Sequence, residues 1–139
     1  MNEIPNGFNP ETINNESDLS AVTSLIERGV TEGHLQPRTR EEIEAVEANF
    51  ILCRKLGGEI VGCVSLDVYT PRLAEIRSLY VTESFRGLGL GKHLIERAIF
   101  RAREKNISEV IAITDKIPLF KDAGFSEILR GQKALFMRL

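Results

Sequence analysis

The sequence has little net positive charge for binding nucleic acid, no long apolar run for crossing a membrane, and no pattern of a signal peptide in its first residues. Its 18 Lys and Arg residues against 20 Asp and Glu residues give a net charge of −2, whereas nucleic-acid binding usually requires a strongly basic face. No apolar run approaches the roughly 20 residues of a membrane-spanning helix. The N-terminal stretch MNEIPNGFNPETINN contains no basic segment followed by an apolar one, as a signal peptide would. We therefore expect a cytoplasmic protein that binds neither nucleic acid nor membrane.

Cysteine and histidine are equally scarce. Cys53 and Cys63 are the only cysteines, and both lie in apolar runs typical of strands, so we expect reduced core residues rather than a disulfide. Together with His34 and His93 they show no ligand spacing, and we therefore expect no metal. We interpret His34 as a loop residue and His93 as partly exposed helix surface, and neither receives a role. The length of 139 residues, without a repeat or a low-complexity linker, suits one domain.

The hydrophobic pattern predicts an α/β fold. The Asn- and Pro-rich residues 1–12 are expected to form a loose arm ahead of a single domain over residues 13–139. The segment TREE, residues 39–42, is typical of a capping box at the start of a helix. The N-terminal half is expected to form a helix over 17–29 that stops at Gly29, a short helix from residue 39 and a strand hairpin that turns at Gly57–Gly58. A strand over 74–81, a long helix after a glycine-rich stretch and a strand over 109–114 are expected to follow. The last elements are a short helix that ends at Gly124 and two short strands around Gly131. This order indicates a mixed, mostly antiparallel sheet with flanking helices.

The stretch TESFRGLGLGKHLIERAIF, residues 82–100, places three alternating glycines behind an arginine and continues as an amphipathic helix. It is not a Walker A loop, which requires a glycine five residues before Gly91, where Arg86 stands, and Ser or Thr after Lys92, where His93 stands. It is not a Rossmann fingerprint, because the spacing is G-x-G-x-G and TESFR separates the strand from the first glycine. Spacing therefore excludes both nucleotide-binding motifs.

The same stretch has the composition of an anion site. Consecutive backbone N–H groups at a helix N-terminus, glycines that let a phosphate approach, and the helix dipole all favour a negative group there. Arg86 and Lys92 would add positive side-chain charge. The alternative is a tight turn that only closes a strand–helix unit. We favour the anion site, and the pyrophosphate of a cofactor is its natural ligand.

The segment RSLYVTESFRGLGLGKHLIERAIFRAREKN resembles the acetyl-CoA-binding segment of the GNAT N-acetyltransferase superfamily. Arg86, Gly89 and Gly91 match the signature R/Q-x-x-G-x-G/A, and LFKDAGF resembles the later (F/Y)-x-x-x-GF element. More narrowly, EGHLQPRTREEIE, EIVGCVSLDVY and LAEIRSLYV resemble the acetyltransferase domain of bacterial N-acetylglutamate synthases, which acetylate the α-amine of glutamate to open arginine biosynthesis. In full-length members that domain follows an arginine-sensing, kinase-like domain. The resemblance implies a stand-alone short form whose response to arginine is open.

The resemblance implies the GNAT fold, with a V-shaped opening between the strand over 74–81 and the strand over 109–114. Acetyl-CoA would lie in this opening as the cosubstrate. The backbone of Leu79 and Val81 would pair with its pantetheine arm like an added strand, and the amides from Gly87 to Lys92 would hold its pyrophosphate. The implied cofactor-binding set is Leu79, Tyr80, Val81, Arg86, Gly87, Leu88, Gly89, Leu90, Gly91 and Lys92.

Acetyl transfer also needs a base, because an ammonium group cannot attack a carbonyl. Glu75 is the candidate catalytic residue, acting directly or through water, and the backbone amide near Leu79 could polarise the thioester carbonyl. Strand alternation would place Glu75 on one side with Arg77, Leu79 and Val81. The alternative is a solvated carboxylate, or one paired with Arg77. Spacing alone leaves the two interpretations open.

The general acid departs from the family pattern. Many family members carry a tyrosine before the GF element that can protonate the departing thiolate, and Phe120 stands at that position here. Thr114 or Lys116 could serve instead, although Lys116 is typical of a solvated loop residue. The general acid therefore stays unassigned.

A dicarboxylate acceptor calls for arginine, which binds a carboxylate through two parallel hydrogen bonds. The resemblance places basic glutamate contacts at Arg38 and Arg72, with Arg77 and Lys133 as further candidates, although each alone is typical of a surface charge. Three functions remain open: acetylation of glutamate, acetylation of another amine (an amino acid, a protein terminus or a small amine), and acyl-CoA sensing without turnover. Members of the family are often dimers, so a homodimer is also open.

Overall fold

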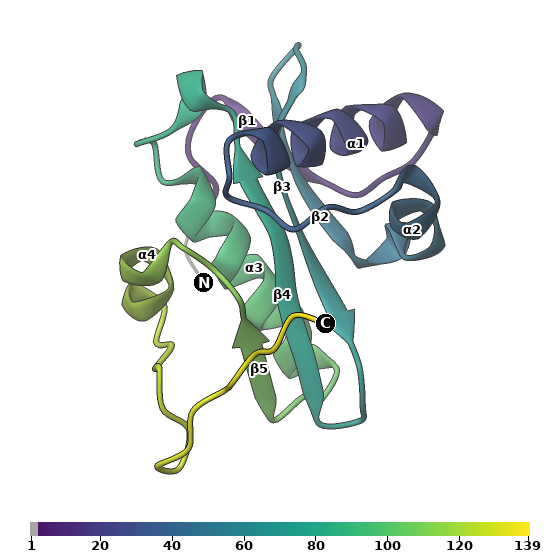
Figure 1. The fold of residues 1–139 in the computed structure, drawn as a ribbon. Helices are drawn as coiled ribbons and strands as arrows, with labels where there is room; N and C mark the ends of the chain where they lie inside the picture. Colours follow the sequence, from purple (N-terminus) through teal and green to yellow (C-terminus); the bar gives the residue numbers. More distant parts are fainter. Residues whose placement is uncertain (1–2) are drawn as a thin grey trace.

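The computed structural model describes residues 3–139, which form one five-stranded sheet with helices on both faces (Figure 1). The strands are β1 (Phe8–Glu11), β2 (Phe50–Lys55), β3 (Ile60–Val68), β4 (Leu73–Val81) and β5 (Glu109–Ala112), and the α-helices are α1 (Glu16–Thr31), α2 (Arg40–Ala45), α3 (Leu90–Glu104) and α4 (Ile117–Asp122). The sheet order is β1-β2-β3-β4-β5, and neighbouring strands are antiparallel except β4 and β5, which are parallel. The mixed, mostly antiparallel sheet with flanking helices predicted from the sequence is confirmed.

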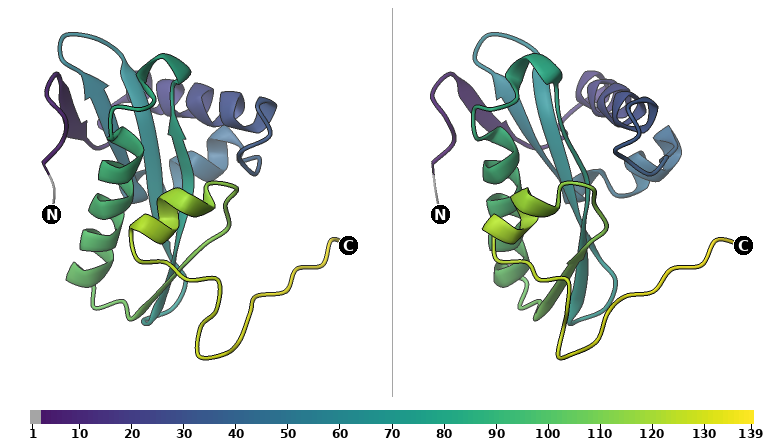
Figure 2. Two further views of the ribbon diagram at one scale, coloured as in Figure 1. Left: turned by 90° about the vertical axis from the view of Figure 1, so that its left-hand side faces the viewer. Right: turned by 60° about the vertical axis from the view of Figure 1, so that its left-hand side comes forward.

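Helices lie on both faces of the sheet (Figure 2), and an apolar layer packs between the helices and each face. α1 and α2 cover one face with Val22, Ile26 and Ile43, and α3 covers the other with Leu94 and Ile95. β3 lies at the centre of the sheet, and all but its last residue are buried. Both cysteines are free and buried in these layers, as predicted. No helix within residues 3–139 combines the length and the apolar character that a bilayer crossing needs.

Local sequence sets the element boundaries. The side chain of Asn15 caps α1 by accepting a hydrogen bond of 2.8 Å from the Asp18 N–H. Thr39 caps α2 by accepting a 3.1 Å bond from the Glu42 N–H, so the predicted helix start at TREE is confirmed. The hairpin between β2 and β3 turns at Gly57, whose φ of +70° suits glycine, as predicted.

The prediction that Gly29 ends the first helix is wrong. The helix continues to Thr31, and Gly33, with φ +81°, follows its end. Gly29 instead permits a close approach, because a Cβ there would stand 2.4 Å from Leu35 Cδ1 and 3.1 Å from Tyr80 Cδ1. The approach of Tyr80 involves a residue far along the chain, so the local pattern carries no sign of it.

Residues 1–12 are not a loose arm throughout, which corrects the sequence expectation. Residues Phe8–Glu11 form β1 and pair antiparallel with β2. The ring of Phe8 lies edge-on to that of Phe85 with centroids 5.9 Å apart, and Arg54 Nε donates to Glu11 at 2.9 Å. Residues 1 and 2 lie outside the described part of the chain.

The two strands predicted around Gly131 are not formed. Arg130 and Gly131, with φ of +51° and +77°, make a two-residue turn in which Leu129 and Gln132 exchange backbone hydrogen bonds of 2.9 Å. Pairing stops at this single bridge, and residues 133–139 extend away from the body of the molecule (Figure 2). A strand requires a partner, and in the described chain none lies beside this segment.

Candidate active site

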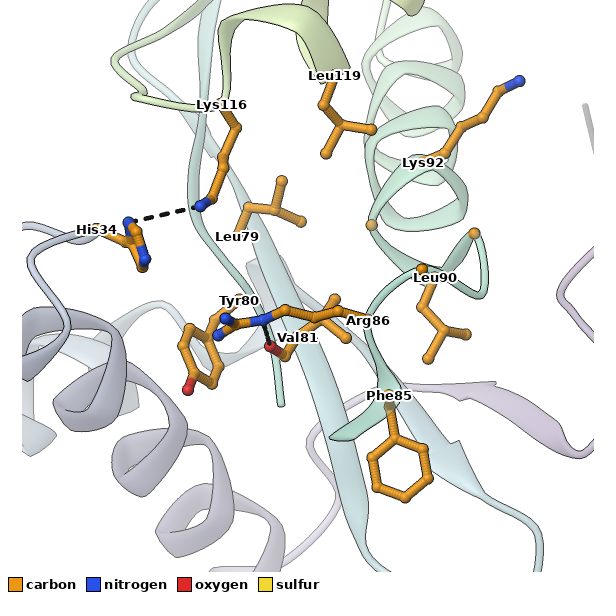
Figure 3. Close-up of a pocket in the computed structure, with 13 residues that line it drawn as sticks. His34, Leu79, Tyr80, Val81, Phe85, Arg86, Leu90, Lys92, Lys116 and Leu119 are labelled. Carbon is orange, nitrogen blue, oxygen red and sulfur yellow. Dashed lines mark hydrogen bonds between the residues drawn. The ribbon is translucent and has the colours of Figure 1, made fainter. Parts of the chain in front are cut away.

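The sheet opens between β4 and β5. The parallel pairing joins Leu73–Ile76 of β4 to Glu109–Ala112 of β5, and β4 then continues to Val81 without β5 beside it. A cavity of about 350 Å³ lies at this open end, walled by β4, the loop before α3, the loop after α1 and the loop before α4 (Figure 3). The V-shaped opening implied by the family resemblance is therefore present.

An extra residue in β4 changes which side chains share a face. β3 pairs Cys63 with Tyr80 and Ser65 with Arg77, so the register shifts between them, and Ser78 takes a φ of +57°. Strand alternation predicted that Glu75, Arg77, Leu79 and Val81 share one side, and this is wrong. Leu79 and Val81 pack on the α3 side with Ile76 and Ala74, whereas Arg77 lies opposite Ser65 in the polar cluster on the α1 side.

The glycine-rich loop forms the anion-accepting end of the cavity. Gly87 and Gly89 have φ of +79° and +88°, which disfavour any residue with a side chain. Gly89 is the N-cap residue of α3, and it has no side chain that could accept a hydrogen bond from the first N–H groups. The first turn of α3 carries no acidic residue either. The first N–H groups of a helix have no acceptor within the helix. At the start of α3 these groups and the positive end of the helix dipole lie at the cavity, where an anion can bind to them.

Most of the residues expected to hold the cofactor line this cavity. They are Leu79, Tyr80, Val81, Arg86, Gly87, Gly89, Leu90, Gly91 and Lys92. Leu88 is the exception and lies exposed at the tip of the loop. Phe85, His34, Lys116 and Leu119 also line the cavity, and the sequence reasoning assigned none of them to cofactor binding.

Arg86 is tied to α1 rather than left free over the loop. Its guanidinium lies 2.8 Å from Glu32 and from the Val81 carbonyl oxygen, and it stacks over the ring of Tyr80 at 5.3 Å (Figure 3). The hydroxyl of Tyr80 also donates to Glu32. Hydrogen bonds from Arg86, and then from Tyr80, hold the pKa of Glu32 below its ordinary value. Arg86 therefore fixes the loop against the end of α1, and its positive charge is balanced by the carboxylate of Glu32.

Glu75 is buried beside a tyrosine and is not solvated. Its side chain accepts a hydrogen bond from the hydroxyl of Tyr69, and the residue is 8% exposed. Burial, and then the hydrogen bond with Glu75, raise the pKa of Tyr69 to about 12. Arg77 pairs with Asp67 across the strand, so the ion pair between Arg77 and Glu75 considered from the sequence is replaced by other partners.

The candidate acids are placed differently from one another. Phe120 is buried and packs edge-on against Phe125 with centroids 5.1 Å apart, which is a core role. The hydroxyl oxygen of Thr114 accepts a 2.8 Å hydrogen bond from the backbone N–H of Lys116. The side chain of Lys116 turns toward the cavity, with its Nζ 3.5 Å from His34 Nδ1 (Figure 3).

Arg38 and Arg77 converge on one carboxylate on the α1 side of the sheet. Arg38 Nη2 lies 3.0 Å from Asp67, and its Nη1 donates to Ser65 and Ser78 at 3.0 and 3.1 Å. Arg77 Nη1 lies 3.6 Å from the same carboxylate. Arg38 is buried, and its Nε has no hydrogen-bond partner among the described residues.

Arg72 and Lys133 are not brought to this cluster. Arg72 is exposed just before β4, at the end of the strand opposite the glycine-rich loop, and its carbonyl accepts from the Ser108 and Glu109 N–H groups. Lys133 lies in the exposed C-terminal segment. The structure therefore groups Arg38 and Arg77 and leaves Arg72 and Lys133 apart from them.

His34 and His93 differ from their sequence interpretation. His93 is buried in α3 rather than partly exposed. His34 lines the cavity, and its Nδ1 lies 2.6 Å from Asp115 Oδ2, which joins the loop after α1 to the loop before α4. The hydrogen bond from His34 is the main reason that the pKa of Asp115 is lowered. The contact joins residues 81 positions apart, so no local motif could have predicted it. Among residues 3–139, no three His, Cys, Asp or Glu side chains are arranged to hold a metal ion.

Comparison with known proteins places this arrangement in one family. Residues 19–125 match the family model described as "Acetyltransferase (GNAT) family". An uncharacterized N-acetyltransferase of Chlorobaculum tepidum is 37% identical over 113 residues, which are 81% of this chain and 72% of that protein. An amino-acid acetyltransferase of Mycobacterium tuberculosis is 29% identical, over 81% of this chain and 65% of that protein.

A solved structure shares the fold and contains ligands. The N-acetylglutamate synthase of Neisseria gonorrhoeae, complexed with coenzyme A and N-acetyl-glutamate, superposes with a TM-score of 0.79 at 25% identity. The match covers 86% of this chain but only 28% of the synthase. The chain thus corresponds to one part of that longer protein.

Proposed function

The chain belongs to the acetyltransferase (GNAT) family, and from this premise we propose that it transfers the acetyl group of acetyl-CoA to the α-amine of L-glutamate. As a family member it is an acetyl-CoA-dependent N-acetyltransferase; the glutamate acceptor, a role in arginine biosynthesis and a cytoplasmic location are our proposal. The observation that supports glutamate as the acceptor is the pair of guanidinium groups, from Arg38 and Arg77, that converge on the carboxylate of Asp67. Relatives named amino-acid acetyltransferases support the same class of acceptor.

The donor fits the cavity through backbone groups more than through charged side chains. The uncapped N–H groups at the start of α3 suit the pyrophosphate of acetyl-CoA. The edge of β4 beyond Ile76, which β5 leaves open, suits the pantetheine arm as an added strand along Leu79 and Val81. Lys92 lines the cavity and adds a positive charge. Arg86 holds the loop in shape through its ion pair with Glu32.

The two converging arginines differ in exposure, and we assign them different roles. Arg38 is buried and hydrogen-bonded, so it holds Asp67 in place. The side chain of Arg77 is 28% exposed and stands 3.6 Å from Asp67, longer than an ordinary hydrogen bond. Arg77 is therefore the group that can turn to the side-chain carboxylate of glutamate, where a planar guanidinium binds through two parallel hydrogen bonds.

We assign Glu75 the role of base. Its carboxylate accepts a proton from the glutamate ammonium, and the resulting amine attacks the thioester carbonyl. The backbone amide of Leu79 polarises that carbonyl as the C–N bond forms. The nitrogen of the tetrahedral intermediate then loses its second proton to water, the C–S bond breaks, the acetyl group stays on the nitrogen as an amide, and CoA leaves as a thiolate that takes a proton from solvent. The hydroxyl of Tyr69 holds the carboxylate of Glu75 in position for this transfer.

The proposal is tested by thiol release from acetyl-CoA, with L-glutamate compared against aspartate, glutamine, lysine, ornithine and spermidine. We expect glutamate-dependent release in the native chain. The variant Arg77→Ala should raise the KM for glutamate by about tenfold to a hundredfold, as the loss of a charged hydrogen-bonded contact of about 1.5–3 kcal/mol implies. Its KM for acetyl-CoA should not change.

Matched controls separate the acceptor from the fold. Arg130→Ala removes an exposed arginine away from the arginine pair and should leave the KM for glutamate unchanged. Release with a different amine would keep the donor site and replace glutamate. Binding of acetyl-CoA without release in the presence of any of these amines would favour acyl-CoA sensing, and the buried Phe120 at the position of the family tyrosine makes that outcome worth distinguishing.

A further inference from the structure

The departing thiolate has no proton donor at the position where many family members carry a tyrosine. Phe120 stands there, and its buried ring has no proton to give. In the proposed reaction the sulfur therefore takes its proton from solvent, which has to reach a group inside the cavity. A side chain that touches both the cavity and solvent can carry that proton.

Few side chains of the cavity can release a proton to the sulfur. The proton-bearing ones are His34, Tyr80, Arg86, Lys92 and Lys116. The hydroxyl of Tyr80 already donates to Glu32. A guanidinium keeps its protons at any ordinary pH, which excludes Arg86. Lys92 lies in the first turn of α3, at the anion-accepting end of the cavity. His34 and Lys116 remain.

His34 and Lys116 lie where the proposed function places the thioester. Figure 3 shows both on the same side of the cavity as Leu79, with the start of α3 on the other side. The pyrophosphate is assigned to the start of α3, and the thioester carbonyl to the backbone amide of Leu79. Because the sulfur is bonded to that carbonyl carbon, it lies at the end of the cavity that holds His34 and Lys116.

The ring of His34 has one nitrogen held and one available. Its Nδ1 lies 2.6 Å from Asp115 Oδ2, and its Nε2 has no hydrogen-bond partner among residues 3–139. In a protonated ring both nitrogens donate, so Nδ1 can bond to Asp115 while Nε2 donates to a ligand in the cavity. The side chain of His34 is also 28% exposed, so the ring can exchange protons with solvent.

The chemistry of imidazole favours His34 over Lys116 as the donor. Unlike a lysine amine, imidazole gains and loses a proton between about pH 5 and 8, and a general acid is most effective in its working pH range. The charged groups around the ring are Asp115 and Lys116 from the loop before α4, and Glu32 at the end of α1 with its partner Arg86. The nearest of them, Asp115, favours the charged ring.

We propose that His34 carries the solvent proton to the sulfur of the departing CoA. The Nε2–H bond of the imidazolium breaks as an S–H bond forms, which leaves a neutral imidazole and CoA as a thiol. The ring then regains a proton from solvent, so the step needs no other reactant. Asp115 is a positioning residue that holds Nδ1. The proposal rests on the place of acetyl-CoA in the proposed function, but not on the identity of the acceptor.

NMR of the CoA complex tests the position of His34 without any acceptor. The chain has two histidines, so the variant His34→Asn assigns their ring signals. We expect nuclear Overhauser contacts from the ring protons of His34 to the methylene protons beside the CoA sulfur. Contacts only to the ribose or adenine, or none at all, would overturn the role of His34. A chain that does not bind CoA would overturn the proposed donor site as well.

The variant His34→Asn separates proton transfer from the contact with Asp115. The asparagine amide can still donate to Asp115 from near the place of Nδ1, but nothing replaces Nε2. With whichever amine supports thiol release, we expect kcat to fall about a hundredfold and the KM for acetyl-CoA to stay unchanged. The native kcat should also fall as the pH rises and the acid loses its proton, and this fall should be absent from the variant.

The variant Lys116→Gln is the comparison for the neighbouring cation. It removes the ammonium group 3.5 Å from His34 Nδ1 and should keep the alkaline fall of kcat. If Lys116→Gln abolished that fall while His34→Asn kept it, Lys116 would be the donor. A native kcat and pH profile in His34→Asn would likewise overturn the proposal.

Discussion

A single carboxylate, that of Asp67, organises the polar cluster under α1. Its Oδ2 lies 3.0 Å from Arg38 and 3.6 Å from Arg77, and its Oδ1 accepts a hydrogen bond from Asn49 at 3.2 Å. Transferring Arg38 from water into this interior is unfavourable by itself, so its place depends on the matching charge. Breaking such a pair is worse than never forming it, because the remaining charge stays buried without a partner.

Asp67→Asn should therefore destabilise the fold strongly. The substitution keeps the shape of the side chain but removes its charge, and we expect the free energy of unfolding to fall by about 3 kcal/mol. Urea denaturation of the variant and the native chain measures this difference. Glu16→Gln is the matched control, since Glu16 pairs with Arg40 at the surface and its loss should cost under about 1 kcal/mol. Equal losses in the two variants would contradict the special role of the buried pair.

At the scale of whole elements, β4 determines both sides of the site. Its extra residue at Ser78 turns Leu79 and Val81 toward the cavity and α3, while Arg77 faces the polar cluster. The cofactor and acceptor groups can therefore come from adjacent positions on one strand. Without the bulge, strict alternation would place all of them on the same face.

Local signals explain what the sequence could predict. The existence of β4, the hairpin at Gly57 and the glycine-rich loop before α3 each follow from a few neighbouring residues, and all were predicted correctly. The bulge at Ser78 escaped because a serine with positive φ has no compositional mark. The approach of Tyr80 to Gly29 and the pair between His34 and Asp115 escaped because they depend on the folded arrangement of distant segments.

The glycine-rich loop allows a test of backbone geometry alone. Gly87 has φ +79°, and a Cβ there would meet nothing within 4 Å, so Gly87→Ala adds conformational strain without a clash. A residue other than glycine loses roughly 1–2 kcal/mol in this conformation. The loop of the free variant can relax, and binding must restore its shape. We therefore expect CoA affinity, measured by titration calorimetry, to fall about tenfold.

Gly57→Ala is the control for this change. Gly57 also has positive φ, at +70°, and open space around it, but it lies in the β2–β3 turn outside the cavity. It should lose a similar amount of folding stability and keep its affinity for CoA. Equal losses of affinity in the two variants would show that general destabilisation, not the shape of the loop, controls binding.

At the scale of the whole molecule, the sheet buries both thiols completely. Cys53 and Cys63 have no exposed surface, and Cys63 also donates a hydrogen bond to the Ser78 carbonyl at 3.3 Å. Loss of hydration raises the pKa of each thiol to about 12. A neutral, buried thiol is a poor nucleophile, so the folded protein should not react with a disulfide reagent near neutral pH, whereas the unfolded chain should expose both cysteines.

The raised thiol pKa values also make the stability of the fold depend on pH in the alkaline range. An unfolded cysteine ionises near pH 9, about three units below the folded one, so the unfolded state loses protons first as the pH rises. The stabilisation is complete below about pH 9 and declines up to about pH 12. Urea midpoints at several pH values should show this decline, and Cys63→Ala should make it shallower while lowering stability at neutral pH through the cavity that it leaves. A variant with the same alkaline slope as the native chain would assign the decline to other groups.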